Sequence, residues 1–318
     1  MTSRARQELP TRGEQLAVMH ARLTAAVEEL VNGEAWQRML RIAAHLPRYS
    51  PSNILLIAAQ RPEATRVMGF RAWTQNGRNV VAGEKGIAIL APCTYRETKP
   101  EVPTPEGVTL TAGETAERVL RGYRVVHVFD ITQTTGKELA DEPQLLRGEA
   151  PERLYDGLAR LIAADGFTLV RGDCRGANGY TDFVSRAIHV RDDIDPAQAV
   201  KTLTHELGHV RADHGRRFLD PTSRTLSCRG AAEVEAESIA YIVLGAAGVD
   251  TRGYSLPYLA GWSDGDVSLL RDTADRVINV AGRIIHEMEP AQTASTVTMG
   301  APELQTSPRV AAINGLTR

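Results

Sequence analysis

Two histidines four residues apart, with a glutamate directly after the first, constrain this chain more than any other feature; they lie in the run HELGH at residues 205–209. The segment is predicted to be helical on separate grounds, because Asp195 is a favoured N-cap residue, Pro196 suits the first helical position, and apolar residues follow at helical spacing. Residues four apart on a helix share one face, so the two imidazoles project together. The run therefore predicts a divalent-metal site, and the neighbouring carboxylate of Glu206 suits a general base acting on water. Two surface histidines beside a solvated glutamate are the alternative.

A catalytic zinc site usually has three protein ligands, so His205 and His209 need a partner from elsewhere in the chain. Glu233 and Glu237 lie four residues apart in a second predicted helix, over residues 231–244. Two like charges on one helix face are unfavourable unless a cation lies against them. We expect Glu233 to be the third ligand of a Zn²⁺ ion and Glu237 to accept a hydrogen bond from a ligating imidazole. A solvated acidic stripe is the alternative reading of this helix.

A further histidine, His214, follows His209 closely. The extended motif that recruits a third histidine places it six residues after the second and puts a glycine between them, whereas here the gap is five and the glycine is absent. We interpret His214 as a residue at the C-terminal end of the motif helix, with Gly215 as its C-cap.

Two short runs with strand character precede the motif helix, at residues 179–184 and 187–191. They are predicted to form a hairpin, and an exposed edge strand there would receive an extended peptide. Many hairpins precede helices and bind nothing, so the alternative stays open. Tyr180, His189 and Tyr241 are all candidates for an electrophile that assists the metal, and spacing does not choose between them.

Two parts of the chain resemble known families. The HELGH run followed by a helix reading ExxAExxA from Glu233 resembles the ImmA/IrrE-type metallopeptidase domain, a compact zincin. The upstream segments YSPSNILL (49–56), QRP (60–62), GFRAW (69–73) and GEKGIAIL (83–90) resemble the single-stranded-DNA-binding domain of ArdC-type antirestriction proteins.

The resemblances imply an N-terminal DNA-binding domain and a C-terminal zinc-dependent peptidase-like domain, in proteins carried by plasmids, phages or other mobile elements. Motif matching assigns the metal role to His205, His209 and Glu233 and the base role to Glu206. It does not assign the DNA contacts.

The charge distribution favours the same division. Residues 38–99 hold ten Lys or Arg against three Glu, although the whole chain has a net charge of −2. A local excess of this kind, interleaved with Tyr49, Phe70 and Trp73, is typical of a surface that binds a polyanion and stacks unpaired bases. The alternative is that Trp73 and Phe70 are core residues and the arginines form a solvated face. The candidate DNA-binding residues are Tyr49, Asn53, Arg61, Arg71, Trp73, Arg78 and Lys85.

The predicted fold class is α+β: a small basic α/β domain over residues 1–148, a mainly helical zincin-like domain with a short hairpin or sheet over 149–290, and a disordered tail over 291–318. Residues 97–117 are predicted to be a mobile excursion and 131–150 a polar linker. Ser263 and Asp266 are predicted to form a capping box for a last long helix. The N-terminus has no apolar signal region and no apolar run approaches the roughly 20 residues that span a bilayer, so we expect a cytoplasmic protein without membrane contact.

The proposed partners are single-stranded DNA and a protein or peptide substrate that the sequence does not identify. Two other functions are compatible with the same residues. One is a non-catalytic protein that coats single-stranded DNA and has a structural metal site, and the other is a regulatory peptidase that cleaves a repressor.

Overall fold

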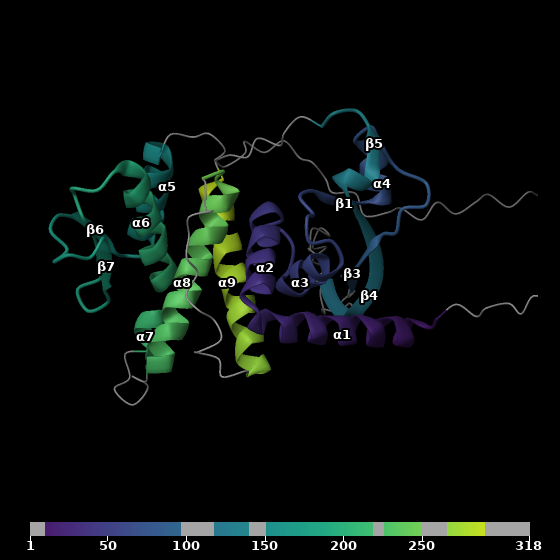
Figure 1. Ribbon diagram of the computed structural model, residues 1–318, viewed down its shortest axis with the longest axis horizontal. Helices are drawn as coiled ribbons and strands as arrows, with labels where there is room; N and C mark the ends of the chain where they lie inside the picture. The colour runs from purple at the N-terminus through teal and green to yellow at the C-terminus, as the bar shows by residue number, and fades with distance from the viewer. Residues whose placement is uncertain (1–9, 97–117, 140–150, 219–225, 250–265, 290–318) are drawn as a thin grey trace, which may run out of the picture.

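The computed structural model describes residues 10–96, 118–139, 151–218, 226–249 and 266–289. Within these ranges the chain forms helices and three small sheets (Figure 1), so the predicted mixture of helix and sheet is confirmed. The helices are α1 (Arg12–Glu28), α2 (Gly33–His45), α3 (Pro51–Gln60), α4 (Phe70–Gln75), α5 (Pro151–Ala164), α6 (Pro196–Arg211), α7 (His214–Phe218), α8 (Leu226–Ala246) and α9 (Val267–Met288). The strands and 3-10 helices are η1 (Glu29–Val31), β1 (Val67–Gly69), β2 (Arg78–Val80), β3 (Ile87–Arg96), β4 (Arg118–Asp130), η2 (Ile131–Gln133), β5 (Thr134–Gly136), β6 (Thr168–Arg171), β7 (Gly179–Asp182) and β8 (Ala187–Val190).

Side-chain caps fix where two of the helices begin. Thr11 and Glu14 form a reciprocal capping box at the start of α1. Asp195 accepts a hydrogen bond from the Gln198 backbone amide at the start of α6, and Pro196 occupies the first turn. The predicted start of the helix that carries the HELGH run is thereby confirmed.

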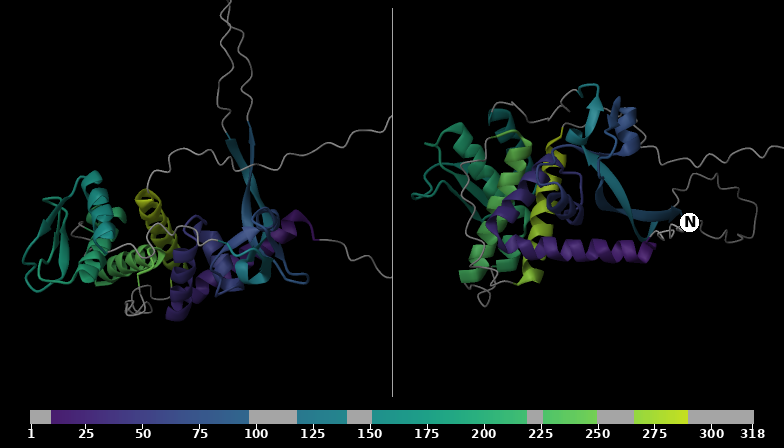
Figure 2. Two further views of the ribbon diagram at one scale, coloured as in Figure 1. Left: turned by 90° about the horizontal axis from the view of Figure 1, so that it is seen from above. Right: turned by 45° about the vertical axis from the view of Figure 1, so that its right-hand side comes forward.

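The described residues of the N-terminal half form two antiparallel sheets. Strands β3 and β4 form a long hairpin with a register shift between Pro92 and Thr94, and β1 adds to the other side of β4. Seen from the direction of Figure 2, left, this hairpin projects away from the helices. Strands β2 and β5 form a separate pair. The fully buried Asp130 at the end of β4 accepts hydrogen bonds from the backbone amides of Thr65, before β1, and Thr132, in η2.

In the C-terminal half, the residues that the structure describes form a sheet in the strand order β6-β8-β7. Strand β8 lies in the middle, parallel to β6 and antiparallel to β7. Strand β7 is therefore at an edge of the sheet. One face of β7 packs against α6. A Cβ atom on Gly179 of β7 would come within 2.5 Å of the Thr202 side chain of α6. The sheet thus places its edge strand beside the helix that carries the two histidines.

Helices from both ends of the chain share one hydrophobic core. Helix α8 packs against α2, α6 and α9, and these helices lie side by side in the middle of Figure 1. The fully buried Trp36 of α2 donates a hydrogen bond from Nε1 to Ser238 Oγ of α8, at 3.0 Å. The apolar cluster runs from Met19 to Met288. The division into domains at residue 148 remains a prediction.

Several local predictions differ from the structure. Residues 131–136 are not a linker, because η2 and β5 form there and β5 pairs with β2. Strand β6 was not predicted. Helix α9 begins without the expected capping box: Asp266 is itself the N-cap and accepts from the Ser268 and Leu269 amides.

Other predictions lie outside the described residues: Ser263, the excursion over 97–117 and the tail over 291–318. Of the helices that the structure describes, none is both long and apolar enough to cross a bilayer.

Candidate metal centre

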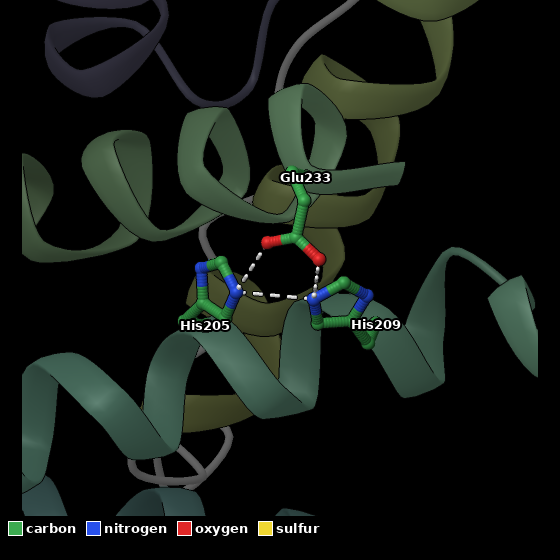
Figure 3. A group of neighbouring side chains, drawn as sticks. All are labelled: His205, His209 and Glu233. Atoms are coloured by element: carbon green, nitrogen blue, oxygen red, sulfur yellow. Dashed lines mark hydrogen bonds and ion pairs between the residues drawn. The ribbon is translucent and has the colours of Figure 1, made fainter. Parts of the chain in front are cut away.

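The two histidines of the HELGH run lie on the side of α6 that faces α8. Their Nε2 atoms are 3.0 Å apart, so both rings present the same nitrogen to one point. This convergence follows from the four-residue spacing on a regular helix. The predicted pairing of His205 and His209 is present in the structure (Figure 3).

Helix α8 brings a carboxylate to the same point. Oε2 of Glu233 lies 3.3 Å from His205 Nε2, and its Oε1 lies 3.6 Å from His209 Nε2. One ligand atom from each of the three residues lies within 4.8 Å of the others. In Figure 3 the glutamate extends from α8 toward the gap between the two imidazoles.

The three groups fit a divalent metal ion in their chemistry and their arrangement. Two imidazole nitrogens and one carboxylate are a ligand set that zinc takes in catalytic sites, and that manganese also accepts. Contact with His205 stabilises the negative charge of Glu233 and lowers its pKa. Burial alone would lower the pKa of His205, but hydrogen bonds to Glu233 and Glu237 outweigh burial and raise it to about 10 in the metal-free protein.

The other nitrogen of His205 contacts a second acid of α8. Nδ1 of His205 lies 3.1 Å from Oε2 of Glu237, and the opposite oxygen of Glu237 lies 3.4 Å from Lys201 Nζ. With its Nδ1 proton held by this carboxylate, His205 would bind a metal ion through Nε2, the nitrogen that faces Glu233, once Nε2 gives up its proton. The structure therefore places Glu237 where the sequence predicted an acceptor for a ligating imidazole.

The other nitrogen of His209 contacts His214, which the sequence interpretation placed incorrectly. Helix α6 ends at Arg211, Asp213 adopts the left-handed conformation at φ 58°, and His214 begins the next helix. The chain reverses at Asp213 and returns His214 to α6, so that its Nδ1 lies 2.8 Å from Nδ1 of His209. Gly215 lies inside α7 and does not cap α6.

A third acid of α8, Glu235, was missed by the sequence reasoning. Its side chain is 1% exposed, and it contacts His214 Nε2 at 2.8 Å and the guanidinium groups of Arg217 and Arg276 at 2.6 Å each. Burial by itself raises the pKa of Glu235, but hydrogen bonds from His214 and Arg217 lower it to about 2. The sequence did contain a signal for Glu235. It is an acid among apolar neighbours, and it lies two positions from Glu233 and hence on another face of the helix, where a buried acid needs a partner.

Glu206 directly follows His205 on α6, and its side chain lies next to β7. Its side chain is buried, and its Oε2 accepts a hydrogen bond from Thr181 Oγ1 at 2.7 Å. Thr181 was not predicted as part of the site. Tyr180 beside it is exposed and stacks on His189 with ring centroids 4.4 Å apart.

Two of the candidate DNA-binding residues are internal. Trp73 is fully buried and donates from Nε1 to the Phe129 carbonyl, and Asn53 is buried and bonds both backbone groups of Leu90. Neither side chain reaches a surface on which a base could lie. Their prediction as contacts is wrong, because both side chains pair with backbone groups of the N-terminal sheet.

Two further candidates are half-buried and have internal partners. Tyr49 donates its hydroxyl to the Val67 carbonyl, and Arg78 donates to Thr134 and to the Lys137 carbonyl. Tyr49 joins the segment before α3 to β1, and Arg78 joins β2 to β5, so a structural role accounts for both residues.

The remaining candidates have exposed surface. Arg71 and Lys85 are exposed, and Arg61 is half-buried. Phe70, at the start of α4, is 57% exposed and rests edge-on against Phe129. Phe70 is therefore an aromatic side chain of this region with an open face, next to a cationic neighbour.

Comparisons with known proteins agree with part of the predicted resemblance. Residues 14–129 match the family model described as the N-terminal domain of anti-restriction factor ArdC. An uncharacterized protein of Bacillus anthracis is 25% identical over 316 residues, which cover 86% of this chain and 52% of that protein. The chain thus spans about half the length of this curated relative.

Two solved structures are also similar to the chain. The metal-free antirestriction ArdC protein from the R388 plasmid has a TM-score of 0.43 and 18% identity, covering 76% of this chain and 85% of that one. The Mn(II)-bound structure of the same protein has a TM-score of 0.46 and 17% identity, covering 77% and 86%.

Proposed function

We propose that the C-terminal half of the chain is a zinc-dependent metallopeptidase of the ImmA/IrrE-like zincin type and that the N-terminal half binds single-stranded DNA. One observation carries the first part: His205 and His209 from α6 and Glu233 from α8 present three ligand atoms to one point. The matched family model supports the second part, because it covers residues 14–129.

In this proposal His205, His209 and Glu233 hold the ion. A bound divalent cation supplies Lewis acidity for a peptide carbonyl and for a water molecule. Glu206 accepts the proton of the attacking water and returns it to the leaving amine, which is general acid and base catalysis by one carboxylate. Thr181 keeps the Glu206 side chain turned toward β7 through its 2.7 Å hydrogen bond.

The substrate in this proposal is an extended peptide segment. Strand β7 is the edge of its sheet and lies beside Glu206, so a peptide that pairs with β7 would pass close to the general base. The exposed ring of Tyr180 lies on the same strand and would contact a side chain of the bound segment.

Glu206→Gln tests the peptidase assignment. The amide keeps the size of the side chain and its hydrogen bond with Thr181 but cannot accept the proton. We expect a zinc-loaded variant that retains its metal and loses cleavage of an unstructured protein such as casein. Unchanged proteolysis would reject Glu206 as the base.

For the whole protein we propose a role in DNA protection, of the antirestriction kind, for a mobile element. Exposed Arg71 and Lys85 attract the phosphate backbone and Phe70 stacks a base. Salt-sensitive binding of single-stranded DNA by the full chain tests this part. The alternative is a non-catalytic DNA-coating protein, which predicts protection of DNA from nucleases that survives Glu206→Gln.

A further inference from the structure

The two metal-facing histidines are oriented by different neighbours. His205 contacts a carboxylate directly, whereas His209 contacts a second imidazole, that of His214. In Figure 3 the second ring nitrogen of His209 points away from Glu233. Behind His209, hydrogen bonds connect His214 to Glu235. Glu235 in turn accepts from Arg217 on α7 and Arg276 on α9.

The direction of these hydrogen bonds follows from their buried end. The ionised carboxylate of Glu235 only accepts hydrogen bonds, and Arg217 and Arg276 already donate to both of its oxygens. The two guanidinium groups outweigh the one negative charge, so a third cation at His214 would be unfavourable there. The Nε2 atom of His214, 2.8 Å from Glu235 Oε2, must therefore carry the proton of a neutral ring.

A neutral His214 with its proton on Nε2 has a bare Nδ1. This atom lies 2.8 Å from Nδ1 of His209, and a hydrogen bond at that distance requires a proton on His209 Nδ1. The lone pair of His209 is then on Nε2, the atom that faces Glu233 at 3.6 Å.

We propose that His214 is a positioning residue that holds His209 in the tautomer able to bind a metal, and that Glu235, clamped by Arg217 and Arg276, holds His214 in turn. The inference rests on the metal site of the proposed function. It adds that metal binding by His209 requires the hydrogen bond from His209 Nδ1 to His214. The reversal of the chain at Asp213 serves this arrangement, because it returns His214 to Nδ1 of His209, the ring nitrogen that does not face Glu233.

Two substitutions at His214 separate its two hydrogen bonds. The Asn carbonyl can occupy the place of the imidazole Nδ1 and accept from His209, whereas Gln reaches the place of Nε2 and contacts Glu235 instead. We expect His214→Asn to bind Zn²⁺ or Mn²⁺ within about threefold of the unaltered chain, and His214→Gln to lose roughly ten- to a hundredfold in affinity. Equal affinities, or tighter binding by the Gln variant, would overturn the proposal.

A control keeps folding apart from positioning. Thr204→Val alters a fully buried side chain of α6 whose hydroxyl donates to the Val200 carbonyl of its own helix. This variant should keep the metal affinity of the unaltered chain. Thermal unfolding of each metal-free variant shows whether it is folded before its affinity is compared.

A second measurement needs no metal at all. In ¹⁵N-histidine NMR spectra of the full metal-free chain, with His209 assigned from the spectrum of His209→Ala, we expect a protonated Nδ1 and a bare Nε2 for His209, and the same tautomer in His214→Asn. A protonated Nε2 on His209 would overturn the proposal that His214 holds His209 in the metal-binding tautomer. If the chain binds neither Zn²⁺ nor Mn²⁺, the proposed metal centre fails, and the tautomer still decides the proposal on His214.

Discussion

Gly208 on α6 packs closely against the backbone of Ala236 on α8. A Cβ atom at position 208 would come within 3.3 Å of both the Cα and the carbonyl oxygen of Ala236. This close approach lies one residue from His209 in the sequence and three from Glu233. The separation of the two helices therefore sets the distance between the two histidines and Glu233, the proposed third ligand.

Gly208→Val should push the helices apart. Extra atoms in a packed interface typically destabilise a protein by about 1–3 kcal/mol, and here they would also move Glu233 away from His205 and His209. We expect a lower free energy of unfolding in urea and a weaker affinity for Zn²⁺. Gly33→Val is the matched control, because a Cβ atom there meets nothing within 4 Å. Parallel losses in both variants would show that the α6–α8 contact is not responsible.

Replacing the acids of α8 one at a time tests which of them binds the metal. Glu233→Ala removes a proposed ligand and should lower zinc content and abolish the rise in unfolding temperature on adding Zn²⁺, since a ligand stabilises only the state that binds it. Glu237→Ala removes the acceptor for His205 Nδ1 and should weaken affinity by roughly ten- to a hundredfold without abolishing binding. Metal analysis after dialysis measures both, and the reverse order of effects would mean that the ligand is one helical turn further along.

Thr181→Val should weaken both the fold and the catalytic step. The buried Glu206 carboxylate loses the hydroxyl donor at 2.7 Å, and an unsatisfied buried acceptor costs about 1–3 kcal/mol. We expect a lower free energy of unfolding and slower peptide cleavage, at unchanged metal content. Thr181→Ser keeps the hydroxyl and should restore both; a Ser variant as impaired as the Val variant would contradict this role.

The buried carboxylate of Glu235 predicts acid sensitivity. Its pKa falls from 4.5 to about 2 on folding, so its stabilising contribution is complete above about pH 4.5 and is lost as the pH falls toward 2. A shift of this size corresponds to about 3 kcal/mol. Urea unfolding of the metal-free protein at a series of pH values should show this loss, and Glu235→Gln should lack it. Glu63→Gln, at an exposed carboxylate paired with Arg41, controls for loss of a surface charge; parallel curves for the unaltered chain and Glu235→Gln would refute the assignment.

Phe70 and Trp73 should respond to alanine substitution in opposite ways. Phe70→Ala removes an exposed ring and should weaken single-stranded DNA binding by about 1–3 kcal/mol, with the unfolding temperature nearly unchanged. Trp73→Ala empties a buried position and should destabilise the fold by about 3–5 kcal/mol. Fluorescence anisotropy with a labelled oligonucleotide measures the first effect and thermal unfolding the second. Tyr180→Ala, at an exposed ring in the C-terminal half, should leave DNA affinity unchanged.

The features that the sequence determined by itself are local. Asp195 and Pro196 set the start of α6, and a spacing of four residues places His205 and His209 on one helix face, because helix geometry repeats every 3.6 residues whatever surrounds it. The same reasoning put Glu233 and Glu237 on a shared face.

The tertiary structure decided which of these side chains meet. Glu233, Glu235 and Glu237 are alike in the sequence, and only the packing of α8 on α6 gives one to the metal position, one to His214 and one to His205. Burial likewise separates Trp73 from Phe70. Such contacts join residues far apart in the chain, and they depend on how whole elements pack, which no local pattern records.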